Sequence, residues 1–183
     1  MRVVIDSSSL LTLIRYYLPF DREKRLYTFI QQKIEAKEII VIEEVYLECK
    51  GIAQGAVVQA LPYLAEKNNR LKTDELLAAP SFINRVENDF IINVLKRELS
   101  ETQLENRKLD YMAGADFKLI LLALREKKGM DPITIVTEET SASNDKKLFK
   151  KIPAICKLQG IDIDCCDLPT YLKNVDGIDF AVN

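Results

Sequence analysis

Residues 2–19 read RVVIDSSSLLTLIRYYLP, and the expected architecture follows from them. Val3, Val4 and Ile5 form a short β-branched run, which is typical of a strand buried on both faces of a parallel sheet. Asp6 follows directly at the carboxyl end of this strand, where open α/β sheets bind their ligands. The alternative, which stays open on this stretch alone, is that Asp6 only caps the next helix.

Further apolar runs predict the rest of the sheet. Residues 39–42, 133–137 and 161–165 read as buried strands, and amphipathic helical stretches separate them. Because strand–helix–strand connections within one sheet are right-handed, the pattern predicts a three-layer α/β/α fold with a central parallel sheet. Residues 54–113 carry no strand signal and predict a run of extra helices in the middle of the chain. We expect them to complete the core of a single domain, residues 1–183, and a separate functional domain is the alternative.

Composition limits the chemistry. The 183-residue chain contains no histidine, which excludes Ser-His-Asp and Cys-His nucleophile pairs and the usual zinc sites. Any catalysis must therefore use carboxylates, lysines, hydroxyls or a carboxylate-bound hard metal ion. A net charge of -2 provides no global field that attracts nucleic acid, so such contacts must come from local basic clusters.

Two further features concern the cellular setting. The four cysteines lack C-x-x-C spacing, so we expect small reduced core residues rather than a zinc site or a disulfide framework. No apolar run reaches the roughly 18 residues of a membrane span, and the N-terminus begins with a strand instead of a signal peptide. We therefore expect a cytoplasmic protein that does not contact a membrane.

Acidic residues recur where predicted strands end or helices begin. Glu48 falls about one turn into the helix after the second strand, Asp116 in the first turn of a later helix, and Glu138 and Glu139 directly after the third strand. A capping role alone would account for Asp116. If these side chains share one edge of the sheet with Asp6, their charges repel and raise one another's pKa values. A divalent cation relieves that repulsion, and oxygen-only ligands suit Mg²⁺ or Mn²⁺.

The order of these short motifs resembles the PIN domain family of metal-dependent nucleases, which includes the toxins of many prokaryotic toxin–antitoxin pairs. The matching pieces are VVIDSS (residues 3–8), VYLE (45–48), GADFKLILLAL (114–124) and IVTEE (135–139). The run KIPAICKLQGIDI (151–163) looks like that of a PIN subfamily of uncharacterised function. The resemblance adds nothing specific for the helical middle of the chain.

The resemblance implies four catalytic carboxylates that also bind the metal ion: Asp6, Glu48, Asp116 and Glu139. PIN nucleases commonly show T-x-D where this chain has Thr137-Glu138-Glu139. Glu139 is the positional match, and its longer side chain departs from the family pattern in a way that would move or weaken a second metal site. Asn144 and Asp145 are reserve candidates for the same position, because their loop can fold back toward the site.

Other residues are expected to assist these carboxylates. Three neighbours are expected to hydrogen-bond or orient them: Ser8, Thr137 and Glu138. Four lysines flank the acid-bearing loop and are expected to bind RNA phosphates: Lys146, Lys147, Lys150 and Lys151. The alternative for these lysines is an ordinary solvated face.

The function implied by the resemblance is a metal-dependent endoribonuclease that hydrolyses single-stranded RNA, with Mg²⁺ or Mn²⁺ as cofactor, as in the toxin of a toxin–antitoxin pair. The expected partners are the RNA substrate and an antitoxin protein, and a homodimer is left open. The rival interpretation is a catalytically inactive PIN-like module that binds protein or RNA. Other phosphate-handling frameworks fit poorly, because G-x-G-x-x-G and G-x-x-x-x-G-K-[ST] are absent.

Overall fold

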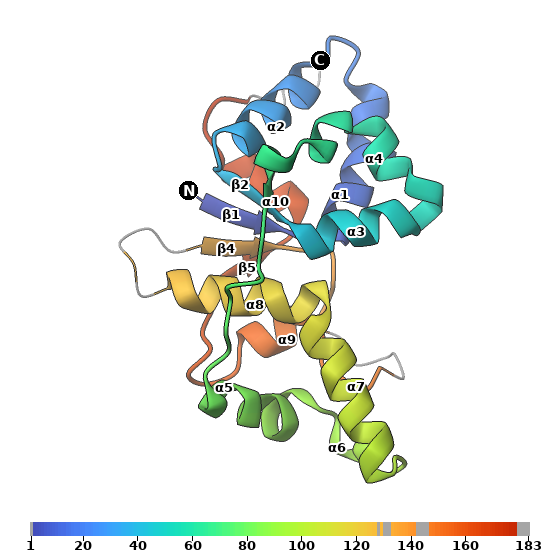
Figure 1. Ribbon diagram of the computed structural model, residues 1–183. Coiled ribbons are helices and arrows are strands. Elements are labelled where there is room, and N and C mark those ends of the chain that lie inside the picture. The colour runs from blue at the N-terminus through green and yellow to red at the C-terminus, as the bar shows by residue number, and fades with distance from the viewer. Residues whose placement is uncertain (1, 128, 130–132, 142–146, 179–183) are drawn as a thin grey trace.

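A five-stranded, all-parallel sheet forms the centre of the molecule, in the order β3-β2-β1-β4-β5 (Figure 1). The computed structural model describes residues 2–127, 129, 133–141 and 147–178. The strands are β1 (Arg2–Ile5), β2 (Ile39–Ile42), β3 (Arg70–Leu71), β4 (Ile133–Val136) and β5 (Cys165–Cys166). Helices flank this sheet, which confirms the predicted α/β/α fold class with a central parallel sheet.

The α-helices connect and cover the strands. They are α1 (Ser7–Thr12), α2 (Arg25–Glu35), α3 (Glu43–Gly51), α4 (Ala56–Ala60), α5 (Pro80–Arg85), α6 (Asn93–Lys96), α7 (Glu101–Ala113), α8 (Ala115–Glu126), α9 (Ile152–Cys156) and α10 (Leu168–Asn174). Short 3₁₀ turns span Leu18–Phe20, Ile52–Gly55, Pro62–Ala65 and Lys67–Asn69, and π-helical turns span Leu13–Tyr17 and Val86–Phe90. None of the helices in the described ranges is long and apolar enough to cross a membrane.

Strand β1 occupies the middle of the sheet. Val3, Val4 and Ile5 are fully buried, as expected for a β-branched strand with neighbours on both sides. Val3 pairs with Ile39 of β2, and Ile5 pairs with Val136 of β4. The chain runs outward from β1 through β2 to β3 and then returns to β4 and β5 on the other side. The strand order therefore reverses beside β1, and ligands of open α/β sheets bind at such a reversal, outside the carboxyl ends of the strands.

Two strands differ from the prediction. The sequence predicts no strand within residues 54–113, yet β3 pairs in parallel with β2; two residues are too few to give a periodic signal. The strand expected at 161–165 begins only at Cys165. Asp162 has a positive φ of 43° and the Ile163 N–H donates to the Cys156 carbonyl. These features hold residues 161–163 in a turn against the end of α9.

Helix α2 begins at Arg25 because Lys24 adopts the left-handed conformation. Near the start of this helix, the Asp21 carboxylate accepts the Tyr27 N–H at 2.8 Å. Farther along, Ser100 and Gln103 form a capping box at the start of α7.

Residues 80–113, comprising α5, α6 and α7, form a helical arm beneath α8 (Figure 1). Phe82, Val86 and Phe90 of this arm are buried in the same core cluster as the sheet. An isolated antiparallel bridge joins Ile91 to Phe149, so the arm also contacts the segment that follows β4. The arm is therefore an integral part of the packed structure.

Candidate active site

Asp6 lies at the carboxyl end of β1 with only 4% of its surface exposed. One carboxylate oxygen, Oδ1, accepts the Ser7 backbone N–H at 2.6 Å and thereby caps α1. The other oxygen, Oδ2, accepts the hydroxyls of Ser8 at 2.6 Å and Thr137 at 2.9 Å. Asp6 is thus a helix cap that also joins the end of β1 to the end of β4, so the two interpretations of this residue are compatible.

Thr137 organises the residues after β4. Its hydroxyl donates to Asp6 and accepts the Glu139 N–H at 3.1 Å. Glu139 points toward the start of α9, where its Oε2 accepts the Ile152 N–H at 3.0 Å. Glu138 points elsewhere, since its Oε1 accepts the Leu168 N–H at the start of α10 at 2.8 Å. The two adjacent glutamates therefore serve different helices, and Glu139 is the one that lines a cavity with Asp116.

Glu48 approaches Asp6 from α3. The Ser7 hydroxyl donates to Glu48 Oε2 at 2.9 Å and lies 3.3 Å from Asp6 Oδ1, so one hydroxyl lies between the two carboxylates. Burial is the main cause of a raised pKa of Glu48, and the charge of Asp6 adds to it, while the hydrogen bond from Ser7 opposes it. Sequence analysis assigned no site role to Ser7; only its place in the serine run after Asp6 hinted at one.

Asp116 occupies the first turn of α8. Gly114 is where α7 ends and α8 begins, and a Cβ there would lie 3.3 Å from the Tyr111 carbonyl, so the turn is tight. Burial raises the pKa of Asp116 to about 7, and the negative charges of Asp6, Glu139 and Glu48 contribute. The electrostatic coupling means that all four predicted carboxylates lie in one neighbourhood.

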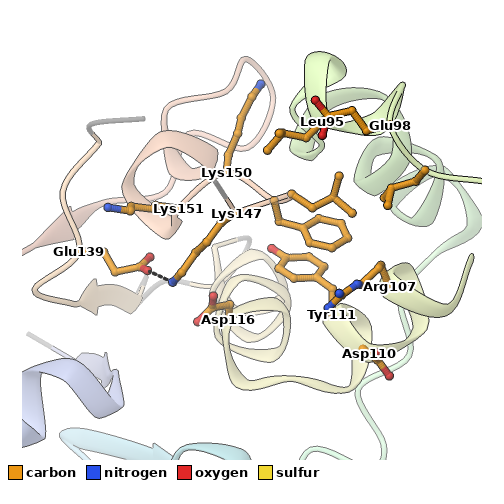
Figure 2. A pocket seen from close by; sticks show the side chains of 13 residues that line it. Leu95, Glu98, Arg107, Asp110, Tyr111, Asp116, Glu139, Lys147, Lys150 and Lys151 are labelled. Carbon is orange, nitrogen blue, oxygen red and sulfur yellow. Dashed lines mark hydrogen bonds and ion pairs between the residues drawn. The ribbon is translucent and has the colours of Figure 1, made fainter. Parts of the chain in front are cut away.

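A cavity of about 580 Å³ opens beside Asp116 and Glu139 (Figure 2). Three of the predicted lysines line it: Lys147, Lys150 and Lys151. The Lys147 ammonium lies 3.4 Å from Glu139 Oε1 and opposes the rise in the pKa of Asp116. The Lys150 ammonium donates to the Asp89 carbonyl at 2.6 Å. The remaining candidates of this loop, Asn144, Asp145 and Lys146, lie outside the described residues.

The next question is whether the four carboxylates could coordinate a metal ion. Within the described ranges, no three acidic or cysteine side chains converge closely enough to coordinate one ion as they stand. The hydroxyls of Ser8 and Thr137 donate to Asp6 Oδ2, and that of Ser7 donates to Glu48 Oε2. The chemistry nevertheless fits a hard divalent cation, since the four groups are all carboxylates, and burial together with the charges of the other three raises the pKa of Asp116.

The cysteines form no disulfide among the described residues. All four are free; Cys49 and Cys156 are buried, and Cys165 and Cys166 are half-buried. This agrees with the expectation of reduced residues that fill the core.

The fold and the site together define an α/β/α protein with one buried carboxylate, Asp6, and three half-buried ones near the point where the strand order reverses. Residues 3–177 match a protein family described as a domain of unknown function, DUF4411. The chain belongs to this family. No curated protein and no solved structure matches the chain.

Ser8→Ala is expected to lower the free energy of unfolding by about 1 to 3 kcal/mol. The Ser8 hydroxyl donates to Asp6 and accepts the Glu138 N–H at 3.1 Å, and the substitution leaves both groups without this partner. Urea unfolding measures the loss. Ser9→Ala is the matched control, because the Ser9 hydroxyl makes only a 3.5 Å contact with Glu138. Equal losses in the two variants would contradict the assigned role of Ser8.

Proposed function

We propose that this protein is a metal-dependent endoribonuclease that hydrolyses single-stranded RNA at the edge of the sheet where Asp6 and Asp116 lie. The observation that carries the proposal is the arrangement of the four carboxylates, since the Ser7 hydroxyl lies between Asp6 and Glu48 while Asp116 and Glu139 line one cavity. Burial, together with the charges of Asp6, Glu139 and Glu48, accordingly raises the pKa of Asp116 to about 7. Functional sites are where such perturbed carboxylates cluster. The resemblance of the surrounding motifs to PIN nucleases supports the same conclusion.

In this proposal, Asp6 and Asp116 are the main ligands of a Mg²⁺ or Mn²⁺ ion, and Glu48 and Glu139 complete or orient the set. Bound there, the ion would polarise the phosphodiester, neutralise charge on the leaving oxygen and lower the pKa of the attacking water. The chain's own hydroxyls have a positioning role. Ser8 and Thr137 fix the orientation of Asp6, and Ser7 fixes that of Glu48.

A binding module without cleavage activity is the second candidate. It is favoured by the observation that no three acidic side chains of the described residues converge on one point. Cleavage of labelled single-stranded RNA in Mn²⁺, and its loss in EDTA, separates the two candidates directly.

The partners of the proposed nuclease follow from the same resemblance. We propose a cytoplasmic RNA substrate and an antitoxin protein that inhibits the enzyme. An adjacent reading frame that encodes a small DNA-binding protein would support the toxin–antitoxin assignment.

Millimolar Mn²⁺ is expected to raise the melting temperature of the wild-type protein. An ion that binds the folded state at 100 times its Kd stabilises it by about 2.7 kcal/mol, and for a chain of this size each kcal/mol corresponds to roughly 2 to 4 °C. Differential scanning fluorimetry with and without Mn²⁺ measures the shift. Asp116→Asn should remove most of the shift, whereas Asp110→Asn, an exposed residue that lines the same cavity, should retain it. An unchanged wild-type melting temperature would count against the metal site.

A further inference from the structure

The helical arm supplies one wall of the cavity beside the carboxylates. Leu95, Leu99 and Arg107 of the arm face the segment 147–151 across this space, while Asp116 and Glu139 line its acidic end. In Figure 2 the ring of Tyr111 separates Asp116 from Arg107. The arm also contributes the carboxylates of Glu98 and Asp110 to the lining, so Arg107 is its cationic side chain in a wall that is otherwise apolar or acidic. The cavity volume of about 580 Å³ lies within the range of cavities that hold small ligands.

Arg107 is the cation that the arm contributes to the lining of the cavity. It is exposed on α7 and lines the cavity. Two other cations of the arm, Lys96 and Lys108, form ion pairs with Glu87. No described residue offers Arg107 an ion pair or a hydrogen bond. A guanidinium in this situation is available for bidentate binding of a phosphate.

An aromatic pair lies at the centre of the cavity wall. Tyr111 of the arm and Phe149 stack with ring centroids 4.0 Å apart and an interplanar angle of 9°. Both side chains remain partly exposed and line the cavity. The Tyr111 hydroxyl is buried and has no hydrogen-bond partner among the described residues, although buried hydroxyls normally have one. A flat aromatic surface beside an available cation is the combination that binds unpaired bases of single strands.

We propose that the arm and the segment 147–151 form a subsite for one unpaired nucleotide of an RNA strand, adjacent to the bond that is cleaved. Arg107 binds the phosphate of this nucleotide, and the Tyr111–Phe149 stack supports its base. The acidic end of the cavity then lies next to the neighbouring phosphodiester. This inference rests on the proposed function for its substrate class, and it gives the arm a role in selecting single-stranded over double-stranded RNA.

The test measures binding rather than cleavage. A fluorescein-labelled oligouridine of about ten nucleotides is titrated with protein in EDTA, which keeps the RNA intact, and fluorescence anisotropy is recorded at several salt concentrations. Arg107→Glu should raise the Kd about tenfold or more and reduce the slope of log K against log salt by about 0.7, the value for one phosphate contact of a single strand. Phe149→Leu should raise the Kd about fivefold or more with no change in slope.

Arg97→Glu is the matched control. Arg97 is exposed on the same arm and does not line the cavity, so the same charge reversal there should change the Kd less than about twofold. Melting temperatures of all variants establish that each is folded.

The outcomes separate this inference from the proposed nuclease activity. If Arg107→Glu and Arg97→Glu bind RNA equally well, the subsite is wrong, and metal-dependent cleavage by the wild type would leave the nuclease proposal intact. If the wild type cleaves no RNA but binds it through Arg107, the subsite is supported and the protein is an RNA-binding module. Equal affinity for a duplex of the same length would overturn the role of the aromatic stack.

Discussion

Asp6→Asn and Asp116→Asn should each reduce RNA cleavage roughly 100-fold or more, because even residues that only support metal ligands cost 10- to 100-fold when replaced. Asparagine keeps the shape of aspartate and removes the charge that a cation needs. Both variants should remain folded. In Asp6→Asn, the amide oxygen of the new side chain can still accept one of the hydrogen bonds that cap α1, and Asp116 has unfavourable charge neighbours in the absence of metal.

The measurement is cleavage of end-labelled single-stranded RNA in Mn²⁺, with parallel reactions in EDTA. Asp110→Asn is the matched control for Asp116→Asn, since it removes an exposed carboxylate from the same cavity. Cleavage that persists in EDTA, or in both site variants, would indicate contamination or a different mechanism. No cleavage of any RNA by the wild type would favour the binding module.

A comparison of the adjacent glutamates sharpens this test. Glu139→Gln should reduce cleavage, although less than the aspartate variants, because the amide can still accept the Ile152 N–H. Glu138→Gln should have a still smaller effect, since the Glu138 carboxylate faces Leu168 at the start of α10. The reverse order of effects would show that Glu138, and not Glu139, completes the metal site.

The metal-free protein should lose stability as the pH rises from about 4 to about 7, and Asp116→Asn should suppress much of that loss. The pKa of Asp116 is raised from 3.8 to about 7 in the folded protein, so the folded state holds a proton that the unfolded state releases at lower pH. The stabilisation of the folded state by the proton on Asp116 is therefore fully present below about pH 4, and it disappears as the pH passes 7.

The expected size of this effect is substantial. Each unit of pKa difference corresponds to about 1.4 kcal/mol. The free energy of unfolding of Asp116→Asn should therefore be higher than that of the wild type by roughly 2 to 4 kcal/mol at about pH 8, and the two should be equal near pH 4. Urea unfolding in EDTA across this range measures the difference. Asp110→Asn should follow the wild-type profile. If the free energies of unfolding of the wild type and Asp116→Asn changed with pH in the same way, the electrostatic description of the site would be contradicted.

The sequence was sufficient to predict the centre of the fold and the positions of its main acids. Val3, Val4 and Ile5 carry a signal of double-sided burial, and the carboxyl ends of parallel strands meet at one edge, which brings Asp6 close to the residues after β4. Asp116 and Glu48 were located by their distance from strand ends and helix starts. These positions can be predicted because hydrophobic periodicity marks the strands and helices, and because the carboxyl ends of parallel strands lie at one edge of the sheet.

The cavity wall could not be predicted in this way. Arg107 and Tyr111 lie on a polar helix far from any strand end, and they reach the site only because α7 packs against α8 and Phe149. The different directions of Glu138 and Glu139 depend on where α9 and α10 begin in space. Such relations arise from tertiary packing, which leaves no repeated pattern in the sequence.

The pairing of β1 with β4 has a consequence for biosynthesis. Asp6 and the hydroxyl of Thr137 that orients it are separated by 131 positions, so a ribosome makes the first carboxylate long before its partner on the neighbouring strand. A nascent chain that ends before β4 has Asp6, Glu48 and Asp116 but not the strand that holds them together. The site is therefore assembled late during translation, and incomplete chains released early lack the arrangement that the proposed cleavage requires.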